Sequence, residues 1–108
     1  MKSTPHQMKD RIEWWVDNKY IHREDGPAVI FTDGPQKGSQ IWMREGKKTR
    51  LDGPAAIWYT PGPYKYRGVD WWIDDGMYSF KDYCKKVKHL ISDEAYFILI
   101  LTYGDDNE

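Results

Sequence analysis

Arginine and aspartate recur two residues apart within two similar hexapeptides, REDGPA and RLDGPA, which place Arg23 with Asp25 and Arg50 with Asp52. Residues two apart on a strand point to the same face, so a row of guanidinium groups could bind an anion or a carboxylate. The alternative is a structural corner, in which the aspartate caps the Gly-Pro turn and the arginine pairs with it or stacks on a tryptophan. The fixed spacing between each pair and its turn residues favours the structural corner.

The other residues that could do chemistry form no recognisable catalytic or metal-binding pattern. The histidines are scattered, at His6, His22 and His89, without the spacing of metal ligands. The single cysteine, Cys84, rules out an internal disulfide, and its place on an apolar helical face indicates a buried thiol. The glycines belong to turns rather than to a phosphate-binding loop. We therefore predict a protein with no enzymatic activity, no cofactor and no metal.

The hexapeptides are part of a longer repeat. A tryptophan stands eight residues before each arginine, at Trp15 and Trp42, and Trp72 begins a third unit in which Phe80 replaces the arginine and no DGPA follows. A fixed period of roughly 20–50 residues is typical of stacked repeat proteins, whose terminal units are atypical. The residues expected to maintain the repeat are Trp15, Arg23, Asp25, Gly26, Pro27, Trp42, Arg50, Asp52, Gly53, Pro54 and Trp72.

Each unit has the pattern of a β-hairpin. Residues that tolerate a positive φ angle, as a tight hairpin turn requires, lie at 17–18, 45–46 and 75–76. Proline ends the second strand because it donates no backbone hydrogen bond, and residues 28–31 and 55–59 predict a further strand. Because side chains alternate along a strand, we expect Trp15, Trp42 and Trp72 on one face of the sheet. Trp14, Ile41 and Trp71 are expected on the other face.

The chain changes character after residue 78. Ser79, followed three residues later by Asp82, resembles a helix cap, and apolar residues then recur at helical spacing opposite a row of lysines. Ser92 indicates a second helix start, and residues 95–103 are expected to form a helix, with a strand as the alternative. So apolar a run should be buried, either against the sheet or against a second copy of the chain.

The predicted class is therefore α+β, an antiparallel sheet of about three hairpin units followed by one or two helices. The expected divisions are a flexible N-terminus (1–11), the hairpin repeats (12–78), a helical cap in the same domain (79–103) and an acidic tail (104–108). With 108 residues, the chain has room for one domain.

Composition narrows the function further. The formal net charge is −1, so the strongly basic character of many nucleic-acid-binding proteins is missing. An aromatic content of 16% indicates a folded chain. The longest apolar run, Ala95 to Leu101, is far shorter than the roughly 20 residues that span a bilayer, and no apolar signal-peptide core is evident near the start. These features predict a soluble, cytoplasmic protein that does not bind membranes.

The segments WVDNKYIHREDGPA and WMREGKKTRLDGPA are similar to repeats in small proteins of bacteriophages and large DNA viruses, most of them uncharacterised. These repeats loosely resemble MORN repeats, which are short β-hairpin units. The resemblance covers about residues 12–103, including the WWIDDGMYSFKDYCKKV segment. It implies a viral protein that works in the host cytoplasm, but no catalytic residues. MORN repeats proper are shorter and richer in glycine, so lipid binding is not implied.

The expected function is a non-enzymatic protein-binding module, a phage accessory protein that binds and inhibits a host defence or transcription protein. Its expected contact residues are Trp14, Trp71, Tyr78, Lys65 and Arg67, with the loops at 33–39 and 60–68. One alternative is nucleic-acid binding through aromatic platforms and the basic residues Lys47, Lys48, Arg50, Lys65 and Arg67. Another is a structural or self-assembling role in the virion. The chain is expected to be a monomer or a homodimer.

Overall fold

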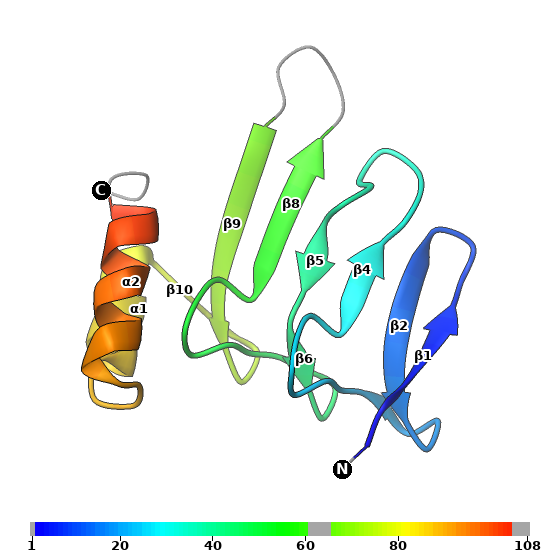
Figure 1. The fold of residues 1–108 in the computed structure, drawn as a ribbon, viewed down its shortest axis with the longest axis horizontal. Helices are drawn as coiled ribbons and strands as arrows, with labels where there is room; N and C mark the ends of the chain where they lie inside the picture. The colour runs from blue at the N-terminus through cyan, green and yellow to red at the C-terminus, as the bar shows by residue number, and fades with distance from the viewer. Residues whose placement is uncertain (1, 61–65, 105–108) are drawn as a thin grey trace.

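The computed structural model describes residues 2–60 and 66–104, and of residues 60, 66 and 67 only the backbone. The fold is α+β, with an antiparallel sheet followed by two helices (Figure 1). The elements are β1 (Thr4–Gln7), β2 (Arg11–Val16), β3 (Tyr20–Ile21), β4 (Val29–Phe31), β5 (Gln40–Ile41), β6 (Met43–Arg44), β7 (Lys47–Lys48), β8 (Ala56–Thr60), β9 (Tyr66–Ile73), β10 (Gly76–Tyr78), α1 (Phe80–Val87) and α2 (Asp93–Tyr103).

The units follow one another across the sheet, as the repeat predicts. The strand order is β1-β2-β4-β5-β8-β9-β10, with β3 paired to β2. Each unit begins with residues that pair with a neighbouring strand of the main sheet and continues into a hairpin. In the first unit, residues 11–13 of β2 pair with β4, and residues 15–16 of β2 pair with β3 in the hairpin. In the middle unit this hairpin, β6-β7, is a separate two-stranded sheet rather than part of one continuous sheet.

Each hairpin turns at two residues with positive φ, the geometry that matches the twist of the flanking strands. These residues are Asp17 and Asn18, Glu45 and Gly46, and Asp74 and Asp75. The first two turns lie where the sequence predicts them. The third lies one residue earlier than predicted, because aspartate tolerates this conformation and Gly76 instead begins β10.

The tryptophan equivalence inferred from the sequence is wrong by one residue in the first and third units. Val16 pairs with Tyr20 across a turn of three residues, whereas Arg44 pairs with Lys47 across only two. The extra residue changes the spacing between tryptophan and arginine. The equivalent residues are Trp14, Trp42 and Trp71, each three positions before the first residue with positive φ.

Backbone hydrogen bonds confirm this equivalence. The Trp14 amide donates to the Ala28 carbonyl at 2.9 Å, and the Trp42 amide donates to the Ala55 carbonyl at 2.7 Å. Likewise, the Arg23 amide donates to the Met43 carbonyl and the Arg50 amide donates to the Trp72 carbonyl, both at 3.1 Å. Trp15 and Trp72 therefore each lie one position after the tryptophan that is equivalent to Trp42.

Two apolar clusters stabilise the fold. One lies within the sheet and consists of Val29, Phe31, Ile41 and Ala56. The other joins the last hairpin to both helices and consists of Trp71, Tyr83, Cys84, Val87 and Leu99. The helices thus close the C-terminal end of the sheet by burying Trp71.

Both predicted helices form, and each begins at the predicted serine. The Ser79 hydroxyl accepts a hydrogen bond from the Asp82 amide at 3.1 Å, and the Ser92 hydroxyl accepts one from the Ala95 amide at 3.1 Å. Such caps satisfy amide groups that have no partner within the helix. Residues 95–103 are therefore helical, and the strand alternative is wrong.

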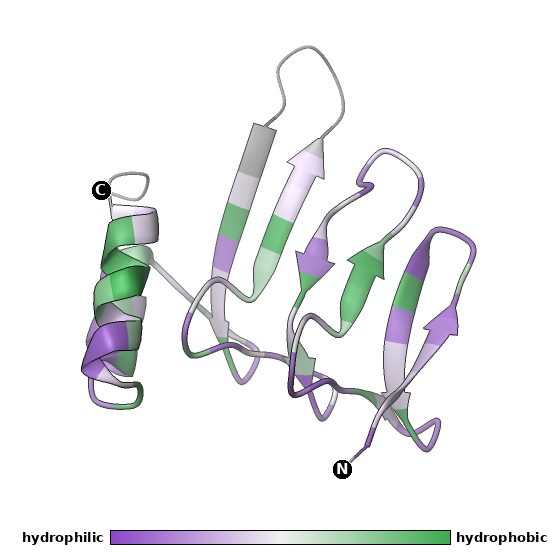
Figure 2. Cartoon of the chain, in the orientation of Figure 1, coloured by the Kyte–Doolittle hydropathy of each residue, from purple (hydrophilic) through white to green (hydrophobic). Residues whose placement is uncertain are grey.

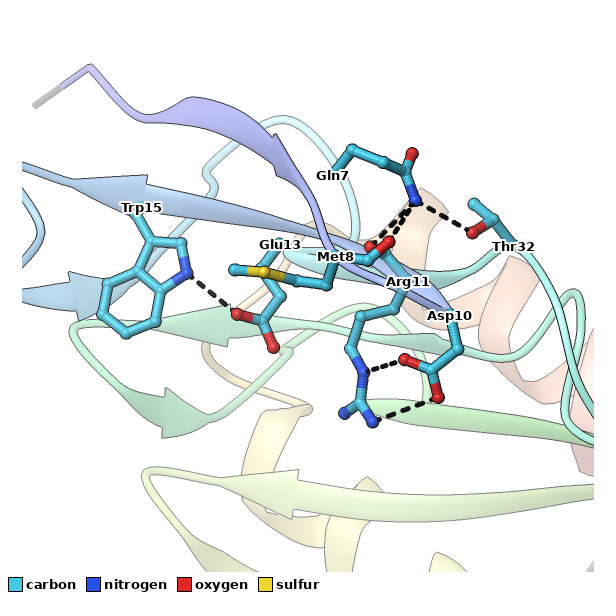
Figure 3. Close-up of polar contacts among 7 residues, drawn as sticks. All are labelled: Gln7, Met8, Asp10, Arg11, Glu13, Trp15 and Thr32. Atoms are coloured by element: carbon cyan, nitrogen blue, oxygen red, sulfur yellow. Dashed lines mark hydrogen bonds and ion pairs between the residues drawn. The ribbon is translucent and has the colours of Figure 1, made fainter.

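The N-terminal residues belong to the sheet, contrary to the expectation of a flexible segment at 1–11. Residues 4–7 form β1, which pairs antiparallel with β2. The Gln7 side chain donates to the Arg11 carbonyl at 3.2 Å and to the Thr32 hydroxyl at 3.3 Å, while Arg11 pairs with Asp10 (Figure 3). The Gln7 amide and the backbone ladder together attach this segment to the first unit. Of the predicted acidic tail, residues 105–108 lie outside the described residues.

Candidate functional site

The repeated arginine is clamped between a tryptophan and the turn of its own hexapeptide. The Arg23 guanidinium lies 4.0 Å from the centre of the Trp14 ring, donates to Asp25 at 3.0 Å and donates to the Pro27 carbonyl at 3.1 Å. Arg50 repeats the arrangement, 3.9 Å from the Trp42 ring and 3.1 Å from both Asp52 and the Pro54 carbonyl. The structural-corner interpretation is confirmed, since ring, carboxylate and carbonyl together orient each guanidinium.

The clamp also explains the glycine in both hexapeptides. A Cβ atom built on Gly53 would lie 2.6 Å from the guanidinium carbon of Arg50, and one on Gly26 would lie 3.2 Å from that of Arg23. Only a residue without a side chain lets the guanidinium fold so closely over the turn.

In the third unit an aromatic ring takes the place of the guanidinium, as the spacing of Phe80 predicts. The Phe80 ring lies 4.9 Å from that of Trp71, the tryptophan equivalent to Trp42. The rings of Tyr83 and Tyr103 also contact that of Trp71, with 4.8 and 5.1 Å between ring centres. The third unit therefore ends in an apolar aromatic cluster that begins the helical cap, instead of an ionic clamp.

The two hexapeptide turns, residues 23–28 and 50–55, are the first and the second corner. Tyr83 connects the helical cap to the second corner. Its fully buried side chain carries a hydroxyl that accepts from the Gly53 amide at 3.4 Å and donates to the Gly53 carbonyl at 2.8 Å and to the Arg50 carbonyl. Burial raises the pKa of the Tyr83 hydroxyl well above its usual range, so it stays a proton donor. Burial also raises the pKa of the Cys84 thiol on the same helix, as expected for an inert thiol.

The structure contradicts the contact surface predicted from the sequence at Trp71, and part of that surface lies outside the described residues. Trp71 is only 3% exposed and lies in the core, so its assignment to a partner-binding surface is wrong. Trp14 is half-buried beneath Arg23, and Tyr78 is half-buried against the core cluster. Lys65 lies outside the described residues, as does the side chain of Arg67. The prediction that Trp14 and Trp71 face outward followed from the assignment of Trp15 and Trp72 as the equivalents of Trp42.

Two of the tryptophan rings on which a nucleic acid could stack are occupied by the protein's own cations. Arg50 covers the Trp42 ring, and the Lys48 ammonium lies 4.7 Å from the centre of the Trp72 ring. A base that stacked on either of these faces would have to displace a cation from it.

Large apolar side chains are exposed together on α2. Four neighbouring side chains on its outer side remain accessible, namely Phe97 (63%), Ile98 (53%), Ile100 (38%) and Leu101 (67%). The opposite side buries Leu99 and packs Tyr96 and Tyr103 against the core cluster. Figure 2 shows the hydrophobic colouring along this helix at the end of the molecule. Of the two expectations for this segment, burial against the chain's own core holds only for its inner side, and burial of the outer side against a second copy stays a prediction.

The signal for this surface was present in the sequence. A helix that is apolar on all sides is either enclosed by its own protein or forms an interface, and periodicity alone cannot tell which. The spacing of Tyr96, Leu99 and Tyr103 marks the buried side, and the remaining apolar residues face outward.

An open groove of about 1090 Å³ runs between the two corners. Its walls include Arg23, Gly26, Trp42, Leu51 and Asp52. His22, which is 3% exposed, also lines it. Its Nδ1 atom accepts from the Glu45 amide at 3.0 Å, so the proton of the neutral ring is on Nε2, which has no hydrogen-bond partner in the described chain.

Known proteins provide no further assignment. Comparisons with models of protein families, with curated proteins and with solved structures found no significant match to this chain. Within residues 2–60 and 66–104, no group of three or more histidine, cysteine, aspartate or glutamate residues is placed to hold a metal ion. No helix in that part of the chain is long and apolar enough to cross a membrane.

Proposed function

We propose that the protein is a non-catalytic protein-binding module whose contact surface is the outer face of α2. The observation that carries this proposal is the exposure of Phe97, Ile98, Ile100 and Leu101 on one helix. Fully burying one such side chain is worth about 1.5–3 kcal/mol, and isolated soluble proteins rarely leave a contiguous apolar patch of this kind uncovered. A rigid helix also presents the patch without an ordering cost on binding.

The charges beside α2 indicate the chemistry of the partner. Helix α1 packs on the same core cluster as α2 and exposes four lysines against one aspartate, namely Lys81, Lys85, Lys86 and Lys88 against Asp82. On α2 itself the only charged residues are Asp93 and Glu94 in the first turn, and none follows from Ala95 to Tyr103, where the apolar face lies. The complementary partner is a protein with an apolar helix or groove bordered by carboxylates. The resemblance to repeat proteins of phages and large viruses makes a host protein in the cytoplasm the expected source.

Substitutions on α2 test this function. Lysine is a good helix former at an exposed position, so the double variant Phe97→Lys/Leu101→Lys should fold while losing the apolar face. Met77→Lys is the matched control, because Met77 is 62% exposed but lies on β10. We expect bis-ANS fluorescence and the capture of a specific host protein to persist in the control and to fall at least about tenfold in the double variant.

Two outcomes would overturn the proposal. If the double variant captures the same proteins as the wild type, α2 is not the contact surface. If light scattering shows a wild-type dimer that the double variant converts to a monomer, α2 joins copies of this chain and the self-assembly alternative replaces the host partner.

A further inference from the structure

The third unit shows what kind of group fits against a repeat corner. Arg50 stands three residues before Gly53, and Phe80, which takes the place of arginine on its tryptophan, stands three residues before Tyr83. Tyr83 therefore occupies the position that glycine holds in the other units. From that position its hydroxyl reaches back to the preceding corner and bonds with the backbone of Gly53 and Arg50.

The first corner presents the same backbone groups but has no such partner. The position equivalent to Tyr83 in the second unit is Gly53, which has no side chain to reach back with. Within residues 2–60 and 66–104, no hydrogen bond reaches the Gly26 amide, the Gly26 carbonyl or the Arg23 carbonyl. Accordingly Gly53 is buried, whereas Gly26 is only half-buried and lines the groove.

Leu51 adds an apolar wall to the groove. The His22 ring also lines it, but the Nε2 atom is buried from solvent and lies 3.6 Å from Oε1 of Glu24, so it is closed to a ligand. The groove thus combines two carbonyl acceptors and an amide donor for a hydroxyl with an apolar wall for a ring.

We propose that the groove at the first corner binds a tyrosine side chain of a partner protein, in the way that the second corner binds Tyr83. The phenol donates its proton to the carbonyl of Arg23 or Gly26 and accepts from the Gly26 amide. The site is separate from the outer face of α2 and does not depend on the function proposed for that face. Phenylalanine lacks the hydroxyl, and phosphotyrosine brings negative charge against two carbonyl oxygens, so both should be rejected.

The test uses N-acetyl-tyrosinamide as the probe and follows the backbone amide signals of the ¹⁵N-labelled protein. A ligand this small is expected to bind with a Kd of about 1 mM. We expect saturable shifts at Gly26 and the indole of Trp42, and at least about tenfold weaker shifts with N-acetyl-phenylalaninamide and the phosphorylated probe. Leu51→Trp should abolish the shifts by filling the groove, since this exposed corner position is glutamate in the first unit and so tolerates different side chains.

The matched control is Leu101→Lys on α2, which should leave tyrosine binding unchanged. Equal shifts with the tyrosine and phenylalanine probes, or no shift at Gly26 with either, would overturn the proposal. If Leu51→Trp lowers the melting temperature, the comparison of the three probes on the wild-type protein decides the matter alone.

Discussion

Replacing Tyr83 by phenylalanine removes one hydroxyl from the contact between α1 and the second corner and keeps the ring that packs on Trp71. The amide and carbonyl of Gly53 and the carbonyl of Arg50 then lose their partner in a site where Tyr83 is fully buried. Leaving a buried polar group unpaired costs about 1–3 kcal/mol, so we expect Tyr83→Phe to lower the free energy of unfolding by about 2 kcal/mol. For a chain of this size, that corresponds to a fall in Tm of about 10 °C.

Urea and thermal denaturation, followed by tryptophan fluorescence, measure this effect. The control is Tyr78→Phe, because Tyr78 packs against the same cluster and its hydroxyl makes no hydrogen bond in the described chain. We expect the control to change stability by less than about 0.5 kcal/mol. Equal stability losses in the two variants would refute the claim that the Tyr83 hydroxyl joins the helical cap to the repeats.

The same variant predicts a pH dependence. The pKa of Tyr83 is raised by burial in the folded state, whereas in the unfolded chain it is about 10. Above that pH the unfolded chain releases the phenol proton while the folded protein keeps it, so this contribution to stability is full below pH 10 and is lost as the pH rises. The fall in stability above about pH 10 should therefore be steeper in the wild type than in Tyr83→Phe. Parallel profiles would contradict the assignment.

Four further substitutions and one measurement of thiol reactivity probe the clamp and the core. Gly53→Ala should destabilise the fold by about 1 kcal/mol and Gly26→Ala by less, because the added Cβ would lie 2.6 Å from a guanidinium carbon in the former and 3.2 Å in the latter and would displace the guanidinium from its clamp; equal urea midpoints would contradict this. Arg50→Lys should cost about 1 kcal/mol, since lysine cannot make the two directed bonds while stacking on tryptophan, and an unchanged midpoint would show that the clamp needs only charge. Trp71→Ala should cost about 3–5 kcal/mol by opening a cavity under the helices, and a stably folded variant would show that this tryptophan is not core. The Cys84 thiol should react with a disulfide reagent at least about a hundredfold more slowly in the folded protein than in urea, because burial disfavours its thiolate; fast reaction in native buffer would place Cys84 at the surface.

The parts of this fold that could be predicted from sequence are those governed by residues close together in the chain. The clamps of Arg23 and Arg50 involve contacts within nine residues, and the serine caps involve contacts within three. The tryptophan register failed because the first and third units each contain one residue more than the second between the tryptophan and the arginine or phenylalanine. In the first unit this residue lies in the turn, and in the third it lies between the turn and Phe80. The residue types of turns do not report such lengths to one residue.

Long-range contacts escaped prediction for a different reason. Tyr83 meets Gly53 across 30 positions, and nothing in either residue type announces that pairing. The sequence left open whether α2 is enclosed by its own chain or contacts a partner, since apolar composition alone does not distinguish the two.

Each guanidinium closes onto the tryptophan of its own hairpin, while adjoining hairpins are linked through main-chain bonds such as Arg23 to Met43 and Arg50 to Trp72. A segment that orients its own arginine and joins its neighbours partly through main-chain atoms common to all residues can be copied in frame with few compensating substitutions elsewhere. Tandem duplication in a gene of this kind would lengthen the stack by whole segments, with the helices carried along intact at its end.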